Sequence, residues 1–268
     1  MQIRHYSKPS PQKKEGEDAI VLNEKARLYG VMDGVTPITG YRDENGHNGA
    51  YLASNTLRAY LERSDGRASL KDEVIAANRE LRQAMLRNGI DLNVKHELWA
   101  SCIAVARVDG DSVSFAQLGD CMAVARYEDG RIVVLTENRV VGVSARAKAK
   151  RARDRENGLP VEDESHFDEL YPKLVYNRAH MANSPEGYGV ANGTDEAADH
   201  IQAGVVETKG LTHLLLVSDG MFHPDLPLEA TMEQIVNDGF EPYVERVEAA
   251  ERAKRLNPDD RSAVLLSW

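Results

Sequence analysis

The chain has 268 residues, of which 42% are hydrophobic and 28% charged, which is typical of a soluble globular protein rather than a disordered one. Acidic residues outnumber basic ones by 43 to 33, and the net charge of −10 argues against binding to nucleic acid or to an anionic membrane. The two cysteines are too few for a disulfide framework, and neither a secretory signal nor an apolar run of about 20 residues occurs, so we expect a cytoplasmic protein.

The length fits either one large domain or two smaller ones. No internal repeat or low-complexity linker divides the chain. We therefore predict one domain over residues 1–268, and we favour a monomer.

The first predicted elements are two strands in AIVLNEKARLYGVMDGV, which begins at Ala19. A polar turn separates them, and the second strand ends at the carboxylate of Asp33. Apolar residues then recur at helical spacing over residues 50–63 and again over residues 70–87. The pattern predicts a hairpin followed by two amphipathic helices.

Strand-like segments return in ASCIAVARV, SVSFAQLGD and MAVARYEDGRIVVLT, and the alternation predicts a three- or four-stranded antiparallel meander. Residues 137–210 lack this periodicity and carry a basic run, an acidic run and the loop NSPEGYGVANG. We interpret them as an irregular insertion with helices and a flap over the site. The basic run, residues 146–155, is expected to be a solvated helix face, and Cys102 and Cys121 to be small core residues.

The last part of the chain begins with LTHLLLVSDGMF, a buried strand that ends at Asp219. Helices are expected near residues 231–238 and 244–255, followed by a final strand in AVLLSW. Strands interrupted by pairs of helices predict an α+β fold, here a central antiparallel β-sandwich flanked by helices, with the insertion before the penultimate core motif.

Acidic residues stand at the ends of the predicted strands or beside them. They are Glu17 and Asp18 before AIVL, Asp33 in VMDGV, Asp219 in LLLVSDG, and Asp259 and Asp260 before SAVLLSW. Carboxylates that converge in a packed domain are costly unless a cation compensates them. Oxygen ligands favour Mg²⁺ or Mn²⁺, and no CxxC or HExxH pattern supports zinc. Asp-Gly can also simply form a turn, so each motif is weak alone.

Taken in order, GEDA, VMDGV, LGDCMAV with YEDGRIVVLT, LLLVSDGMF and DDRSAVLL resemble the motifs of the metal-dependent protein phosphatases of the protein phosphatase 2C type. The resemblance extends from about Glu17 to Leu266 and skips the insertion after Thr136. It implies a β-sandwich that holds two Mn²⁺ or Mg²⁺ ions at one edge, with a weaker site for a third ion.

The resemblance also implies roles for individual residues. Asp33 is similar to the ligand that bridges the two ions, Gly34 to the residue that offers its carbonyl, and either Glu17 or Asp18 to a ligand acting directly or through water. Asp219 and Asp259 resemble ligands of one metal, with Asp259 favoured over Asp260 by its spacing to the last strand, and Asp120 resembles the third-ion ligand. Lys13 falls where the family has a phosphate-contacting arginine.

Two positions depart from the family pattern. Val35 follows the Asp-Gly where the family commonly has a histidine as general acid, and His47 in the next loop is a possible substitute that is more typical of an exposed loop. Lys13 supplies a point charge but not the bidentate fork of arginine.

The function implied by the resemblance is hydrolysis of phosphoserine and phosphothreonine in a phosphorylated protein, by in-line attack of a metal-activated water and without a covalent phosphoenzyme. Asp33 and Asp219 are the expected catalytic residues. Two alternatives remain open at this stage. One is a non-catalytic binding or regulatory module, suggested by Val35 and Lys13, and the other is a phosphatase for small phosphorylated metabolites that uses the same two-metal site.

Overall fold

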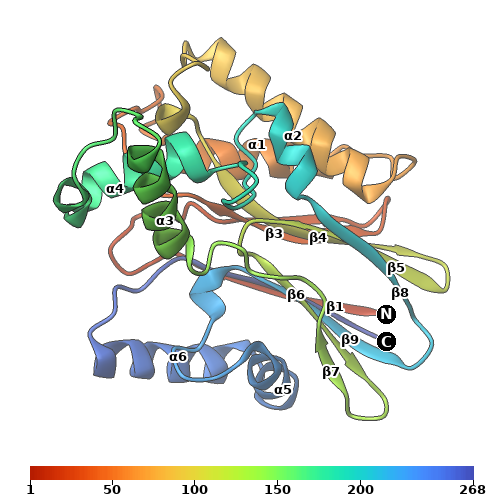
Figure 1. Ribbon diagram of the computed structural model, residues 1–268. Coiled ribbons are helices and arrows are strands. Elements are labelled where there is room, and N and C mark those ends of the chain that lie inside the picture. Colours follow the sequence, from red (N-terminus) through yellow and green to blue (C-terminus); the bar gives the residue numbers. More distant parts are fainter.

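A computed structural model describes all 268 residues and has four layers, with two antiparallel five-stranded sheets packed face to face between two layers of helices (Figure 1). One sheet has the order β1 (Gln2–Lys8), β10 (Arg261–Ser267), β9 (Leu211–Val217), β6 (Met122–Tyr127) and β7 (Ile132–Val134). The other has the order β2 (Ala19–Asn23), β3 (Leu28–Gly34), β4 (Ser101–Asp109), β5 (Ser112–Leu118) and β8 (Gln202–Glu207). The predicted sandwich is confirmed.

Pairs of helices cover the outer faces of the sandwich. Helices α1 (Gly49–Glu62) and α2 (Leu70–Arg87) pack on the sheet that contains β3, and α5 (Leu228–Asp238) and α6 (Phe240–Lys254) pack on the sheet that contains β9 (Figure 1). All four were predicted within a few residues. None of them, nor any other helix, combines the length and apolar character needed to cross a membrane.

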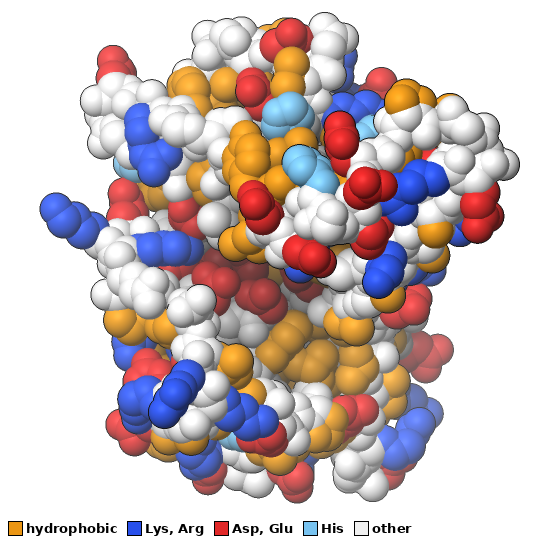
Figure 2. Space-filling model, turned by 60° about the vertical axis from the view of Figure 1, so that its left-hand side comes forward, with side chains coloured by type: hydrophobic (Ala, Val, Ile, Leu, Met, Phe, Trp, Pro, Cys, Tyr) orange, Lys and Arg blue, Asp and Glu red, His pale blue; other side chains and the backbone are white.

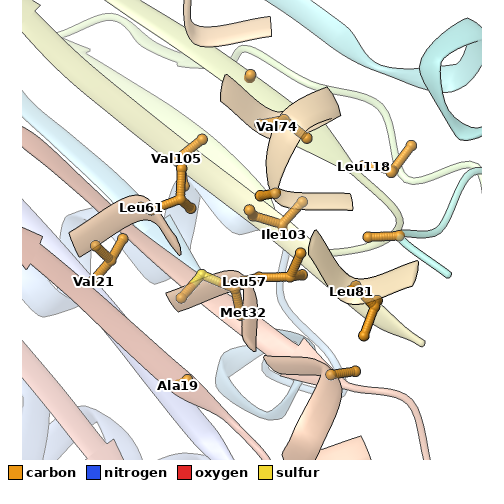
Figure 3. Packing of buried hydrophobic residues seen from close by; sticks show 14 of the residues in the cluster. Ala19, Val21, Met32, Leu57, Leu61, Val74, Leu81, Ile103, Val105 and Leu118 are labelled. Carbon is orange, nitrogen blue, oxygen red and sulfur yellow. The ribbon is translucent and has the colours of Figure 1, made fainter. Parts of the chain in front are cut away.

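Most of the core strands are buried on both faces, which explains their continuous apolar sequences. Because side chains alternate along a strand, β10 places Val264 and Leu266 between the sheets and Ala263 and Leu265 beneath α5 and α6. On the other side, Leu57 of α1 and Leu81 of α2 meet the strands in the cluster drawn in Figure 3. The helical spacing of these residues was the sequence signal for both helices.

Two features of the sandwich differ from the sequence prediction. The polar N-terminal segment forms the edge strand β1, which pairs with β10 and was not predicted because its residues are half-exposed and charged. The predicted meander is wrong, because β4 and β5 pair in one sheet whereas β6 and β7 belong to the other. The chain crosses between the sheets at residues 119–121, so Asp120 lies at the crossing.

The region predicted as an insertion, residues 137–210, contains the α-helices α3 (Val143–Glu156) and α4 (Leu170–Tyr176) and the π-helix η3 (Asn177–Met181). It also contains two 3₁₀-helices, at Glu164–Asp168 and Asp195–His200. Its last strand, β8, pairs with β5 and so belongs to the sandwich. The expectation that the basic run is a solvated face is wrong for Arg151, which is 3% exposed and bound by Glu164. Cys102 and Cys121 are buried free thiols, as predicted.

Candidate active site

Five strand ends from both sheets meet at one end of the sandwich and bring the predicted carboxylates together. Asp33 is the penultimate residue of β3, Asp120 lies between β5 and β6, and Asp219 follows β9. Asp18 immediately precedes β2, and Asp259 stands two residues before β10. Figure 2 shows acidic side chains at the base of a hollow that crosses this face of the molecule, with Lys and Arg side chains on its rim.

Strand periodicity explains the direction of Asp33. Val31 packs between the two sheets and Met32 packs beneath α1, so Asp33 points back toward the layer between the sheets, at its open end. Its register partner on β4 is Cys102. The carboxylate therefore lies where the hydrophobic core ends.

Two glycines allow the main chain to approach closely behind these carboxylates. A Cβ on Gly34 would come within 2.6 Å of the carbonyl oxygen of Ala50 and 2.7 Å of that of Glu17. A Cβ on Gly220 would come within 1.9 Å of the carbonyl oxygen of Asp260. The glycine after each aspartate is thus required for packing, and it places Asp33 and Asp219 beside the segments that carry the other carboxylates.

The carboxylates raise one another's pKa because they are buried together. Burial, followed by the charge of Asp18 and that of Asp219, raises the pKa of Asp33 well above its usual range. Burial together with the nearby carboxylate of Asp120 raises the pKa of Asp219 to about 7, and burial raises the pKa of Asp18 to about 8 against the lowering effect of a hydrogen bond from Ser218. Burial likewise raises the pKa of Asp120. Such a cluster of negative charge is stable in its ionised form only with a cation.

The donor set fits hard divalent cations. Asp219 has a buried carboxylate oxygen, Oδ1, without a hydrogen-bond partner, which is an uncommon and costly state for a native protein. The neighbouring carboxylates of Asp33, Asp120 and Asp259 supply oxygen ligands of the kind that Mg²⁺ and Mn²⁺ prefer. No three carboxylate, imidazole or thiol groups already surround one point as in a filled metal site.

Lys13 is the cation that the structure places among the acidic side chains. Its ammonium group lies 2.6 Å from Glu17 Oε2, 2.9 Å from Asp260 Oδ2 and 3.6 Å from Asp259 Oδ1. The first two contacts are hydrogen bonds, and the third is an ion pair beyond hydrogen-bond distance, so two of the three N–H donors of the ammonium group are used. The predicted contact of Lys13 with phosphate stays a prediction.

Asp259 and Asp260 have different surroundings. Asp260 is 2% exposed and accepts hydrogen bonds from the backbone N–H groups of Ser10 and Glu17 at 2.6 Å each, so it ties the N-terminal segment to the start of β10. Asp259 keeps an exposed side chain, and its charge contributes to the raised pKa of Asp219. Asp259 Oδ1 accepts a hydrogen bond from Asp260 N, and Asp259 Oδ2 is free for a ligand, whereas both oxygens of Asp260 are bonded.

Glu17 and Asp18 are also distinguished by their partners. The Glu17 carboxylate is held by Lys13 and by the Nδ2 group of Asn48. Asp18 accepts one hydrogen bond, from Ser218 Oγ at 2.8 Å, and lies close enough to Asp33 to raise its pKa. Asp18 therefore lies among the other site carboxylates, whereas the carboxylate of Glu17 is held in place by Lys13 and Asn48.

His47 lies next to Asn48 in the loop that precedes α1. Its ring stacks on Tyr51 with 4.1 Å between centroids, and its two nitrogens lie 3.1 Å from Asp43 Oδ2 and 3.4 Å from Glu15 Oε2. The structure thus holds His47 by neighbouring side chains rather than leaving it in solvent. Its role as a general acid stays a prediction.

Sequence reasoning missed two groups that organise the cluster. Asn48 caps the N-terminus of α1 through a hydrogen bond from Tyr51 N while its amide holds Glu17. An asparagine directly before an amphipathic helix is a recognisable cap signal. Ser218, which binds Asp18, had no such signal, because its role depends on the pairing of β9 with β10.

Comparisons with known proteins show the family and the fold of the chain. The sequence model of the family described as Protein phosphatase 2C matches residues 12–259. No protein among the curated sequences matches the chain.

Among solved structures, serine/threonine phosphatase Stp1 from Staphylococcus aureus is 15% identical, with a TM-score of 0.61, and the match covers 100% of this chain and 94% of that one. The Mycobacterium tuberculosis serine/threonine phosphatase PstP/Ppp is 15% identical with a TM-score of 0.61, covering 98% and 97%. A catalytic domain of PstP in complex with two manganese ions is 17% identical with a TM-score of 0.61, covering 98% and 96%. At these identities the likeness concerns the fold.

Proposed function

Because the chain belongs to the protein phosphatase 2C family, and is on that ground a protein phosphatase, we propose that it uses divalent metal to hydrolyse phosphoserine and phosphothreonine monoesters in proteins. The observation that carries this proposal is the group of buried, mutually repelling carboxylates from both sheets, which includes the unpartnered oxygen of Asp219. Such perturbed groups in one hollow are typical of a functional site.

We propose that two Mn²⁺ or Mg²⁺ ions compensate this charge, as in the manganese complex of PstP. The ligands would come from Asp33, the Gly34 carbonyl, Asp219 and Asp259, with Asp18 or Glu17 acting directly or through water, and Asp120 would hold a weaker third ion. When bound, two such ions supply a hydroxide near neutral pH and neutralise the phosphoryl oxygens during in-line attack.

The protein's own groups would fix the geometry of this reaction. Ser218 orients Asp18 by a hydrogen bond, and the backbone contacts of Asp260 hold the N-terminal segment in place. Asp33 and Asp219 would act as the catalytic carboxylates. Since Val35 has no titratable group, the leaving serine or threonine oxygen would take its proton from water or from His47.

The proposed substrate is a phosphorylated protein, and the net charge of −10 disfavours nucleic acid. A small phosphorylated metabolite would meet the same carboxylates. Relative turnover of a phosphothreonine peptide and of sugar phosphates would separate these two substrate classes, and we expect the peptide to be hydrolysed with the higher kcat/KM.

The first experiment is hydrolysis of p-nitrophenyl phosphate by the purified protein with Mn²⁺, with Mg²⁺ and with EDTA, beside Asp219→Asn. We expect turnover that requires metal and is lost in this variant. Asp238→Asn is the matched control, because Asp238 is exposed at the end of α5 and pairs with Arg246. Equal turnover in EDTA, or full activity of Asp219→Asn, would contradict the proposal.

A further inference from the structure

The insertion forms a surface cavity of about 600 Å³ that contains none of the site carboxylates. Helix α3, the segment that follows it, α4 and the π-helix η3 contribute its walls. Three aromatic rings and two prolines, those of Phe167, Tyr171, Tyr176, Pro160 and Pro172, give the walls an apolar character. A cavity of this size and lining is typical of a binding site.

One wall of this insertion cavity is attached to the loop that follows β3. The π-helix η3 contributes His180 to the cavity, and Arg178 of the same helix donates a hydrogen bond from Nη2 to the carbonyl oxygen of Thr36. Val35 alone separates Thr36 from Gly34, the last residue of β3. Figure 2 turns the side that carries α3 and α4 forward and shows hydrophobic and histidine side chains above the acidic hollow. The insertion cavity therefore lies near the proposed active site but outside it.

The aromatic wall is held in place by the chain itself. The rings of Phe167 and Tyr176 meet edge to face with 5.3 Å between centroids, and both side chains are buried. The guanidinium of Arg151 lies over both rings and is bound by Glu164. A wall that is ordered before binding loses little conformational entropy when a ligand arrives.

The rim of the cavity is apolar although it faces solvent. Leu159 and Tyr171, which line the cavity, are 54% and 60% exposed, and the adjoining Leu170 is 67% exposed. A group of exposed large apolar side chains is typical of a surface that binds another protein. In the wall, the hydroxyl of Tyr176 is buried without a hydrogen-bond partner, which is uncommon in a native protein. A tryptophan side chain would fill the cavity and offer an N–H donor.

The surroundings of the cavity are acidic. Residues 159–176 include five acidic side chains and one basic side chain. Glu164 is bound by Arg151 and Arg155, whereas the other four acidic side chains are exposed and form no ion pair. These four are Glu162, Asp163, Asp168 and Glu169. Their charge favours a ligand that carries basic groups beside its apolar part.

We propose that the insertion cavity binds a segment of a partner protein in which one aromatic side chain is flanked by arginine or lysine. The aromatic ring enters the cavity beside Tyr176, and the basic groups meet the acidic side chains around it. No residue proposed for catalysis lines the cavity, so this binding does not depend on the proposed phosphatase function.

The probe is a fluorescein-labelled peptide of the sequence RRGWGRR, titrated with the full chain at physiological salt and followed by fluorescence anisotropy. RRGAGRR lacks the aromatic anchor, and EEGWGEE reverses the flanking charge. We expect RRGWGRR to bind with a Kd below about 100 μM and each control peptide to bind at least about 10-fold more weakly. No binding of RRGWGRR at about 1 mM protein, or equal binding of RRGAGRR, would overturn the proposal.

Tyr171→Ala tests the apolar rim. Because Tyr171 is exposed, the variant should fold, and the Kd of RRGWGRR should rise at least about 10-fold. Leu256→Ala is the matched control, since Leu256 is 48% exposed in the loop after α6, away from the insertion, and its Kd should equal that of wild type. Unchanged affinity in Tyr171→Ala would place the peptide elsewhere and overturn the proposal.

Glu162→Lys and Glu128→Lys separate local charge from net charge. Both side chains are exposed and form no ion pair, but only Glu162 lines the cavity. Glu162→Lys should raise the Kd of RRGWGRR at least about fivefold, and Glu128→Lys by less than about twofold. Equal losses would show that the peptide responds to the net charge of the protein, against the proposal. Indole that displaces the peptide at a similar concentration would instead make the cavity a site for a small aromatic molecule, which also overturns the proposal.

Discussion

Two regions of the molecule bring charged side chains together: the strand-end cluster, formed by Asp18, Asp33, Asp120 and Asp219, and the insertion, residues 137–210. In the insertion the charges around Arg151 have partners of opposite sign, whereas in the strand-end cluster most neighbours carry the same charge. In the insertion, Arg151 stacks on Phe167 and Tyr176, with its guanidinium carbon 4.1 Å and 4.8 Å from their ring centroids, and binds Glu164. Hydrogen bonds from Arg151 and Arg155 lower the pKa of Glu164 to about 2. In the strand-end cluster the pKa of Asp219 is raised to about 7 and that of Asp18 to about 8.

We conclude that the paired charges of the insertion stabilise the fold, whereas the carboxylates of the strand-end cluster are arranged to bind a ligand. Each carboxylate of the first kind meets a cation of the same chain, so its ionised form contributes to stability. The carboxylates of the second kind mainly meet one another, and their ionised form is destabilising until a cation arrives. Substitutions in the two regions should therefore have opposite effects on activity and stability.

The largest expected effect is that of Asp33→Asn. The amide keeps the shape of the side chain but removes the charge between Asp18 and Asp219, so kcat for p-nitrophenyl phosphate should fall by about 1000-fold or more, equivalent to about 4 kcal/mol. The metal-free variant should be at least as stable as wild type, because one repulsive charge is gone. Turnover and urea unfolding in EDTA measure both quantities, and an active or strongly destabilised variant would break the comparison.

The metal-free protein should also lose stability as the pH rises. The pKa values of Asp18 and Asp219 lie above their ordinary values in the folded protein, so between about pH 4 and pH 8 the folded state binds more protons than the unfolded chain. Stability in EDTA should therefore fall by roughly 3–4 kcal/mol from pH 6 to pH 8.

Urea titrations at the two pH values measure this slope, with the double variant Asp18→Asn, Asp219→Asn as control, in which the slope should flatten. Saturating Mn²⁺ should reverse the loss, since metal ligands bind as carboxylates. The contrary result would be that wild type and the double variant both become more stable from pH 6 to pH 8 in EDTA. It would mean that other groups of the protein already compensate the negative charge of the carboxylates.

The strand ends were predictable from the sequence because each carboxylate follows or precedes an apolar run, as for Asp33 in VMDGV and Asp219 in LLLVSDG. Burial on both faces produces that run, and the turn chemistry of glycine marks its end. The sandwich and its two helix pairs follow from the same local signals. The assignment of β6 and β7 to the sheet that contains β9 could not be predicted from local signals, because strand pairing depends on tertiary contacts rather than on distance along the sequence.

Groups that act across the fold were the ones that the sequence concealed. Strand β1 is half-exposed, so it lacks an apolar run, yet it brings Lys13 and Glu17 to Asp260. Arg178 lies in a segment without periodicity, and nothing local indicates that it reaches Thr36. Their positions depend on where the chain returns in space, which one sequence does not encode in any short motif.

Glu164→Gln tests the insertion side of the comparison. Glu164 is the one carboxylate bound by the buried Arg151, so its loss leaves a charged donor group unsatisfied and should lower the free energy of unfolding by about 1–2 kcal/mol. The kcat for p-nitrophenyl phosphate should stay at the wild-type value. Urea unfolding measures the loss, and Glu186→Gln, which breaks the exposed pair with Arg153, is the control with less than about 1 kcal/mol expected. A large fall in kcat without a change in stability would instead place Glu164 in the active site.

Lys13→Gln sharpens the comparison where the two kinds of charge meet, since Lys13 is a compensating cation inside the strand-end cluster. Asp260 keeps its backbone hydrogen bonds from Ser10 and Glu17 when the ammonium is removed, so the fold should survive. Because the ammonium already donates hydrogen bonds to Glu17 and Asp260, we expect the inhibition constant of inorganic phosphate to change by less than about threefold. A rise of tenfold or more would mean that the ammonium leaves its carboxylates for the substrate and that Lys13 contacts the phosphate. If the expected result is obtained, Lys13 stabilises the folded chain and does not bind substrate, although it lies among the carboxylates of the active site.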